Sequence, residues 1–195
     1  FLAAGNHDAP HVLARLQRYP NVRVLNGKPQ YFRGLTILGF PDPASATNDP
    51  AVPAPAVYRQ LAREVQATLE ASPRPVDILA LHNAAAAPPS LKGVPLLLHG
   101  HDHRLSVTKR GETVWIDAGT TGAAGVRGLD QKVPYSLVLL YFERRAEPDA
   151  TGRLYRLVAA DTIQVDNLMA GFRLERILFS SEVSQPGAAA LQLEE

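Results

Sequence analysis

The chain has 195 residues, of which 46% are hydrophobic and 20% are charged, and its formal net charge is +1. This composition is ordinary for a soluble globular protein, and the near-neutral charge gives no electrostatic case for nucleic acid or an anionic membrane as the partner. Cysteine is absent, so disulfides and thiolate metal ligands are excluded, and imidazole, carboxylate and amide oxygen remain. No apolar run approaches the ~20 residues that a membrane-spanning helix needs, so no membrane segment is expected in this chain.

The first 55 residues predict alternating strands and helices. The apolar run Phe1–Ala4 predicts a strand that leads into Gly5-Asn6-His7-Asp8, and a helix is predicted over Ala9–Tyr19 with Asp8 as its N-cap. A loop rich in Pro, Asp and Ala over Pro41–Pro55 is either a binding segment or a plain connector. The strands expected between that helix and that loop are Val22–Leu25, Gln30–Arg33 and Leu35–Phe40.

The middle of the chain contains the clearest helix and two buried strands. Apolar residues recur at four-residue intervals over Ala56–Ala71, which predicts an amphipathic helix. Val76–Leu81 predicts a strand that ends at His82, and Pro95–Leu98 predicts a short buried strand that ends at Gly100-His101-Asp102-His103. Both strands therefore deliver histidines where they end.

The remainder is predicted to be mostly strand. Arg104–Lys109 and Glu112–Asp117 predict a hairpin, and the glycine-rich stretch 118–128 lacks the spacing of a nucleotide-binding phosphate loop. We expect one domain over residues 1–180 and a disordered tail over 181–195. The last predicted strands are Ser136–Glu143, Arg153–Ala160 and Phe172–Phe179.

Histidine-bearing loops follow three of these apolar strands, after residues 4, 81 and 98. Two histidines spaced by two on a loop that leaves a rigid strand can turn both imidazoles towards one point, which suits a metal ion. A solvated polar turn is the alternative for His101 and His103, but packing alone does not explain three such loops. His99 is expected to pack or to support the site, and His11 is expected at the surface.

Together these motifs resemble the second half of the calcineurin-like metallophosphoesterases, through Gly5-Asn6-His7-Asp8, a strand ending at His82, and Gly100-His101-x-His103 in that order. The resemblance implies an α/β fold, a sandwich of two mixed β-sheets flanked by helices. The family's earlier motifs, Asp-x-His and Gly-Asp-x-x-Asp, do not occur here, so we expect the C-terminal part of a longer protein without its N-terminal strands. Segments 35–43 and 119–129 are similar to a bacterial subgroup whose members often carry an N-terminal membrane anchor, which would place the domain outside the cytoplasm.

The resemblance also implies roles for single residues. Asn6, His82 and His101 would bind one metal ion, and His103 would bind a second. Two divalent ions (Mn, Fe, Zn or Co) ~3.5–4 Å apart would produce a bridging hydroxide that attacks a phosphomonoester or a phosphodiester. His7 would be the general acid that protonates the leaving alkoxide, and Asp8 would hydrogen-bond its ring, with a plain helix cap as the alternative role of Asp8.

The bridging aspartate and the other ligands of the second metal would come from the absent N-terminal motifs. We therefore expect this chain alone to bind at most one metal tightly and to hydrolyse little, unless an N-terminal segment or another chain completes the site. One alternative is a non-catalytic metal-binding or interaction module that retains the fold, and another is an unrelated histidine metal-binding protein. The intact pair of His7 and Asp8 argues against the non-catalytic module, which has no use for a general acid.

Overall fold

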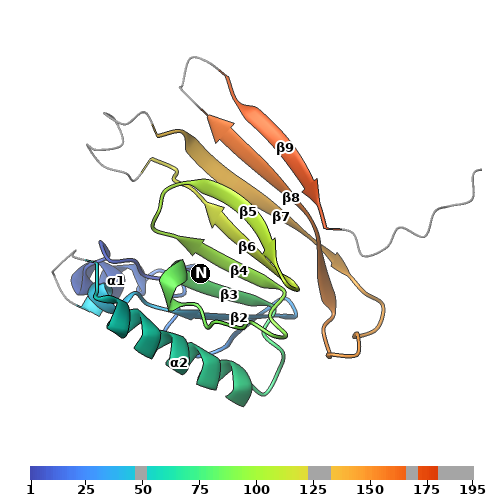
Figure 1. The fold of residues 1–195 in the computed structure, drawn as a ribbon, viewed down its shortest axis with the longest axis horizontal. Coiled ribbons are helices and arrows are strands. Elements are labelled where there is room, and N and C mark those ends of the chain that lie inside the picture. The colour runs from blue at the N-terminus through green and yellow to red at the C-terminus, as the bar shows by residue number, and fades with distance from the viewer. Residues whose placement is uncertain (47–51, 123–132, 166–170, 180–195) are drawn as a thin grey trace, which may run out of the picture.

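The computed structural model describes residues 1–46, 52–122, 133–165 and 171–179, and it shows two β-sheets with helices on the outer side (Figure 1). The larger sheet has six strands in the order β1-β2-β3-β4-β6-β5, and the smaller has three in the order β7-β8-β9. The predicted α/β architecture of two sheets is confirmed, although the described strands of the smaller sheet are all antiparallel rather than mixed. The elements are α1 (Pro10–Leu16), β1 (Gln30–Phe32), β2 (Leu35–Phe40), the 3₁₀-helix η1 (Pro43–Ala46), α2 (Pro55–Ala71), β3 (Ile78–Asn83), the 3₁₀-helix η2 (Ala84–Ala86), β4 (Leu96–Gly100), β5 (Leu105–Arg110), β6 (Thr113–Ala118), β7 (Tyr135–Arg144), β8 (Tyr155–Val165) and β9 (Arg173–Leu178).

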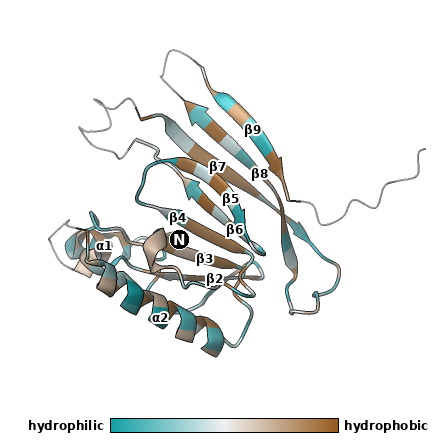
Figure 2. Ribbon diagram, viewed as in Figure 1, coloured by the Kyte–Doolittle hydropathy of each residue, from teal (hydrophilic) through white to brown (hydrophobic). Residues whose placement is uncertain are grey.

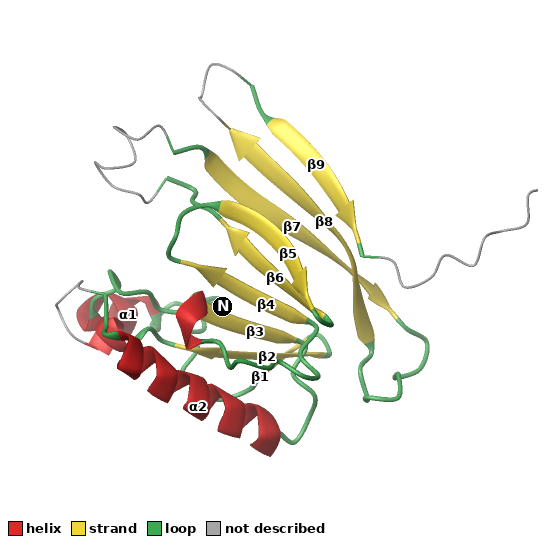
Figure 3. Cartoon of the chain, viewed as in Figure 1, coloured by secondary structure: helices red, strands yellow, loops and turns green. Residues whose placement is uncertain are grey.

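Strands β2, β3, β4 and β6 pair in parallel, so their carboxyl ends meet at one edge of the larger sheet. Figure 3 shows the arrowheads of β4 and β6 pointing the same way, towards the α1 side of the molecule. One row of the register joins Ile37, Ile78, Leu96 and Val114 across the four strands. Because both faces of this parallel centre are covered, its strands are mostly apolar, which explains why runs such as 95–98 predict buried strands.

Two apolar clusters cover the two faces of the larger sheet. On one face, Val65 of α2 is fully buried. It belongs to the same apolar cluster as Leu79 and Leu97 of the sheet. On the other face Leu96 packs within a cluster that Val138 and others of the smaller sheet join. Figure 2 shows the hydrophobic colours concentrated on the central strands between these layers. The apolar residues that recur every four positions over 56–71 thus form the face of α2 that contacts the sheet.

The predicted elements agree with the structure best where strands or helices are buried. The helix predicted over Ala56–Ala71 begins one residue earlier, and the predicted hairpin of residues 104–117 forms as β5 and β6. Residues 123–128 of the glycine-rich stretch, the centre of the loop at 47–51 and the tail at 181–195 lie outside the described residues. No helix of the described ranges is long and apolar enough to cross a membrane.

Three predictions near the N-terminus need correction. The helix predicted over Ala9–Tyr19 is only Pro10–Leu16, and its N-cap is Ala9 rather than Asp8. The strands predicted over residues 1–4 and 22–25 amount to a single parallel bridge between Leu2 and Val24. The central strands pair along several residues, whereas in the described chain these two segments share only this bridge.

Candidate metal centre

Three segments that are distant in sequence bring polar side chains to the carboxyl edge of the larger sheet. His82 is the next-to-last residue of β3, and His101 directly follows β4. Asn6 comes from the loop after residue 4, where the Ala4 carbonyl accepts a hydrogen bond from the Asp42 amide at 2.8 Å. That bond ties the N-terminal segment to the chain that leaves β2. The parallel strand arrangement therefore explains why these side chains meet.

His82 is the centre of the cluster. Its Nε2 lies 2.9 Å from Asn6 Oδ1 and 3.2 Å from His101 Nδ1. The rings of His82 and His101 are nearly perpendicular, at 82°, with their centroids 5.2 Å apart. Asn6 is 6% exposed, so an amide that would ordinarily face water is held inside the protein. One amide oxygen and two imidazole nitrogens thus converge on a small volume.

Gly5 is required by the close approach of His82. A Cβ at position 5 would lie 2.6 Å from both Cε1 and Nδ1 of the His82 ring, which is closer than real side chains approach. The Gly5 amide also donates to Asp8 Oδ2 at 2.8 Å, and the Asp8 amide donates back to the Gly5 carbonyl at 3.0 Å. The Gly5–Asp8 turn is therefore closed at both ends and presents Asn6 towards His82.

The loop after β4 has an uncommon backbone. His101 has φ of 78° and His103 has φ of 56°, so both lie in the left-handed region. For residues with a side chain this conformation costs roughly 1–3 kcal/mol and persists only where surrounding structure enforces it. Such outliers cluster at functional sites, so two of them within three residues make this loop a candidate functional site.

Burial controls the charge of His82. Burial lowers the pKa of His82 below its ordinary value, the Asp42 and Asp8 carboxylates oppose this, and His101 and His103 add to the lowering. A lowered pKa favours the neutral imidazole, which is the form that binds metals. The environment of His82 therefore favours the protonation state that a metal-binding imidazole needs.

Asp42 and Tyr58 were not predicted from the sequence as parts of the site. Asp42 is 3% exposed and accepts hydrogen bonds from the Tyr58 hydroxyl at 2.9 Å and from the Ala44 amide at 2.9 Å. Burial, followed by the bond to Asp42, raises the pKa of Tyr58 to about 12. Tyr58 also contacts the side chain of Asn83, which follows His82. Nothing in the sequence singles out Asp42; in the structure it lies two residues after β2, which pairs with the β3 strand that carries His82.

A second buried pair lies on neighbouring strands. His99 and Asp117 are register partners on β4 and β6, and Asp117 Oδ1 accepts the Gly119 amide at 2.8 Å. Nδ1 of His99 and Oδ2 of Asp117 are 3.7 Å apart, and neither has a hydrogen-bond partner in the described part of the chain. Burial raises the pKa of Asp117. His99 also packs edge-on against Trp115, in keeping with the packing role predicted for it.

The other predicted site residues lie around this cluster. His7 is exposed beside Asn6, and His11 is exposed on α1. Within the described ranges no hydrogen bond joins Asp8 to His7, and Asp8 Oδ2 accepts from the Gly5 amide. His103 is close enough for its charge to lower the pKa of His82. The cluster in direct contact is thus Asn6, His82 and His101, and metal binding by all four predicted ligands stays a prediction.

The two spacings from His82 Nε2 to its neighbours are compatible with ligand atoms around a divalent cation. Zn–N bonds of about 2.0–2.1 Å place neighbouring donors about 3.0 Å apart in octahedral and about 3.4 Å apart in tetrahedral geometry. The observed donor spacings of 2.9 and 3.2 Å are close to these values. No three His, Asp or Glu side chains in the described residues form such a group.

Comparisons with known proteins give only distant likeness. No family model matches the chain, and no curated protein matches it. Among solved structures, Vps29 of Entamoeba histolytica complexed with Zn²⁺ has 15% identity and a TM-score of 0.40, over 91% of this chain and 80% of that chain. Vacuolar protein sorting 29 of Cryptosporidium parvum has 12% identity and a TM-score of 0.31, over 92% of this chain and 97% of that chain. A Staphylococcus aureus protein described as a 5′-nucleotidase has 14% identity and a TM-score of 0.41, over 91% of this chain and 38% of that chain.

Proposed function

We propose that this chain forms part of a phosphoester hydrolase, with Asn6, His82 and His101 as ligands of one divalent cation. The convergence of their donor atoms within 2.9 and 3.2 Å supports this most strongly. A neutral imidazole and an amide oxygen suit Mn, Fe, Zn or Co. A cation bound there would act as a Lewis acid on the phosphoryl oxygens.

Each protein residue then has its own task. Asn6 Oδ1 and His82 Nε2, which lie 2.9 Å apart, are the neighbouring ligand atoms, and burial lowers the pKa of His82, which favours the neutral imidazole. His7 lies exposed next to Asn6, where a phosphoester in solution can reach it. Its ring N–H would protonate the oxygen of the leaving alcohol. Asp8 supports His7 indirectly, because it closes the turn that carries His7.

His103 is proposed as a ligand of a second cation. One imidazole does not hold a cation by itself, and the described residues offer no further His, Asp or Glu group that could. The remaining ligands would come from an N-terminal segment or another chain. The second candidate function is a non-catalytic metal-binding or interaction module that retains the fold.

The test measures hydrolysis of p-nitrophenyl phosphate and bis(p-nitrophenyl) phosphate with Mn²⁺, Co²⁺ or Zn²⁺, in this chain and in a longer protein that carries the family's N-terminal motifs. We expect little turnover by the chain and metal-dependent turnover by the longer protein. His7→Gln should reduce turnover by about 10²–10⁴-fold without loss of metal, because proton donation by a positioned side chain contributes that much. His11→Gln is the matched control and should be unchanged.

The outcomes separate the candidates. Turnover that needs metal and His7 supports the hydrolase. Metal binding without turnover in the longer protein supports the non-catalytic module, and absence of metal binding in both proteins refutes each of them.

A further inference from the structure

The smaller sheet packs one of its faces on the larger sheet and turns the other away from it. Every second residue of β7 from 138 to 142 joins the apolar cluster between the two sheets. Side chains alternate along a strand, so the odd-numbered residues of β7 point away from the larger sheet. Register partners share a face, which extends this surface across β8 and β9. The surface, here called the outer face, consists of Leu137, Leu139 and Tyr141 on β7, Ala159, Asp161 and Ile163 on β8, and Leu174, Arg176 and Leu178 on β9.

The outer face is largely apolar and exposed. Leu174 and Leu178 are 55% and 70% exposed, and the three residues on β7 are exposed by 39% to 47%. Figure 2 shows hydrophobic colours at intervals along β9. A whole large side chain presents about 200 Å², so these five and the half-exposed Arg176 present roughly 600 Å². Patches of that size are the largest that a typical monomer exposes, and they often serve binding.

The charged groups in the centre of the outer face satisfy each other. Asp161 is only 3% exposed, and its carboxylate accepts hydrogen bonds from Arg176 Nε at 2.6 Å and Nη2 at 2.7 Å. The Tyr141 hydroxyl donates to the same carboxylate at 2.7 Å. A partner that covers the outer face therefore leaves neither charge unpaired, and the face attracts neither a strongly acidic nor a strongly basic partner.

The middle row of the outer face is lower than the rows on either side. Ala159 and Asp161 on β8 are 6% and 3% exposed, whereas the neighbouring rows on β7 and β9 stand out into solvent. A two-fold axis beside β9 would bring the β9 row of each copy over the β8 row of the other, between its two raised rows. A surface that fits itself in this way forms an isologous dimer.

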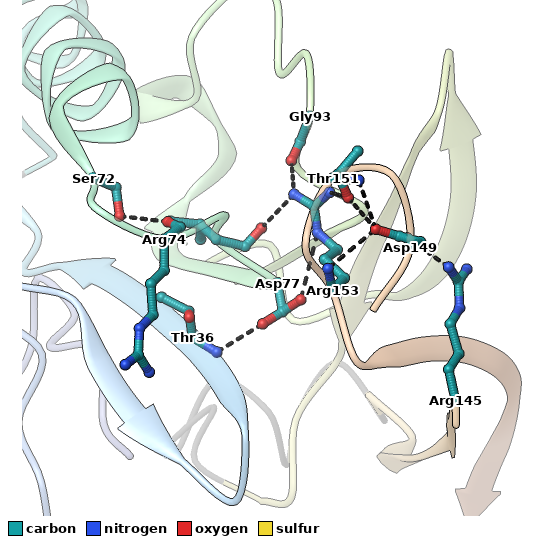
Figure 4. A network of polar contacts seen from close by, with 10 residues as sticks. Thr36, Ser72, Arg74, Asp77, Gly93, Arg145, Asp149, Thr151 and Arg153 are labelled. Atoms are coloured by element: carbon teal, nitrogen blue, oxygen red, sulfur yellow. Dashed lines mark hydrogen bonds and ion pairs between the residues drawn. The ribbon is translucent and has the colours of Figure 1, made fainter. Parts of the chain in front are cut away.

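The β7–β8 hairpin is fixed to the larger sheet through Arg153 (Figure 4). Its Nη2 donates to the carbonyls of Val76, at 3.3 Å, and Gly93. Its Nη1 donates to Thr151 Oγ1 at 2.6 Å, and its Nε lies 3.4 Å from Asp77 Oδ1. These contacts join the turn between β7 and β8 to the segments before β3 and β4. The outer face is thus formed before a partner binds, which reduces the ordering cost of association.

We propose that the outer face is the interface of a homodimer, in which two copies of this chain pack their smaller sheets against each other. Two such faces would bury about 1,200 Å², which is the lower limit of stable protein–protein interfaces. Identical faces do not repel each other, because each Arg176 is neutralised by the Asp161 of its own chain. His82 and His101 belong to the other sheet, so this dimer does not depend on the proposed function.

Sedimentation equilibrium of the chain tests the proposal. The chain has a mass of 21.1 kDa, and the weight-average mass should rise towards twice that value as the concentration is raised to about 1 mM. The dimer should dissociate on dilution, because its interface is at the lower size limit. In ¹⁵N-labelled protein, dilution should shift the amides of residues 159–163 and 174–178 and leave that of His82 unchanged. The mass of a single chain at every concentration would overturn the proposal.

Matched variants test whether the outer face is the surface that associates. Leu174→Lys should weaken association at least about tenfold, because the dimer would bury an unpaired charge. Val57→Lys makes the same change at a residue of α2 that is 41% exposed and lies outside the outer face, and it should alter association less than about twofold. Leu174→Met should retain the dimer, because it preserves volume and apolar character. Urea denaturation checks that each variant folds.

Three results would overturn the proposal even if the chain associates. Equal effects of Leu174→Lys and Val57→Lys would show that association uses another surface. Dissociation in about 1 M NaCl would show that charges rather than apolar contacts hold the copies together. A longer protein that stays a single chain where this chain dimerises would show that one of its own segments covers the outer face.

Discussion

Replacing Gly5 by alanine tests whether the backbone of the N-terminal loop determines the position of His82. A Cβ at this position would lie 2.6 Å from two atoms of the His82 ring, whereas ordinary contacts begin at 3.4 Å. The ring must therefore move by about 0.8 Å, or the turn must open. Overpacking of this kind typically costs about 1–3 kcal/mol of folding free energy. Gly5→Ala should lower the free energy of unfolding by that amount.

The same displacement should disrupt the metal centre. Ligand distances must hold within about 0.2 Å, so a shift of 0.8 Å in the ring removes His82 from a preformed site. We expect Zn²⁺ or Mn²⁺ affinity to fall by about 10–100-fold, the usual effect of losing support for a ligand. Isothermal titration calorimetry measures the affinity, and urea denaturation measures the stability.

Gly100 provides the matched control. It directly precedes His101, yet a Cβ there would meet only the His82 carbonyl oxygen, at 3.9 Å, which is an ordinary contact. Gly100→Ala should therefore change the metal affinity by less than twofold. It should change the free energy of unfolding by no more than about 0.5 kcal/mol. Equal behaviour of the two alanine variants would refute the argument, since it would show that the approach of His82 to Gly5 does not shape the site.

Two further predictions concern other parts of the fold. Tyr58→Phe should lower the free energy of unfolding in urea by about 1–2 kcal/mol, because it leaves the buried carboxylate of Asp42 without one of its donors, whereas Tyr19→Phe, at an exposed tyrosine, should change nothing measurable. Hydrogen bonds from Thr151 are the largest cause that lowers the pKa of Asp149, to about 2 from 3.8. The unfolded chain then binds the proton first as the pH falls, so Asp149 stabilises the fold above about pH 4 and loses this effect towards pH 2. Asp149→Asn should flatten that part of the acid-denaturation curve, and a curve unchanged from the parent, or matched by Glu147→Gln, would contradict the assignment.

The fold could be predicted where burial makes the pattern unambiguous. The central strands around residues 78–83 and 96–100 are mostly apolar because helices and a second sheet cover both their faces. In α2, the spacing of the apolar residues directly indicates the face that contacts the sheet. The N-terminal segment was predicted less accurately, because an apolar run such as residues 1–4 predicts a strand whether or not a neighbouring strand exists to pair with it. Among the residues that the structure describes, the pairing of this run is limited to the Leu2–Val24 bridge. Pairing is a tertiary property that the local pattern does not contain.

The candidate site could be predicted as far as its histidines. His82 and His101 follow buried strands, and parallel pairing brings them together, as that pattern suggests. The role of Asp8 as a helix cap was wrong: the N-cap position is Ala9, and the Asp8 carboxylate accepts from the Gly5 amide. Asp42 was missed because it stands in a segment rich in Pro, Ala and Asp, where nothing in the sequence distinguishes a buried carboxylate from a solvated one.

The central claim is that Asn6, His82 and His101 bind one divalent cation. A titration of ¹⁵N-histidine-labelled chain with Zn²⁺, followed through the imidazole resonances, tests it most directly. We predict saturation at one equivalent, with large shifts of His82 Nε2 and His101 Nδ1 and none at His11. Zinc that shifts all histidines alike, or that leaves His82 and His101 unchanged at saturation, would contradict it.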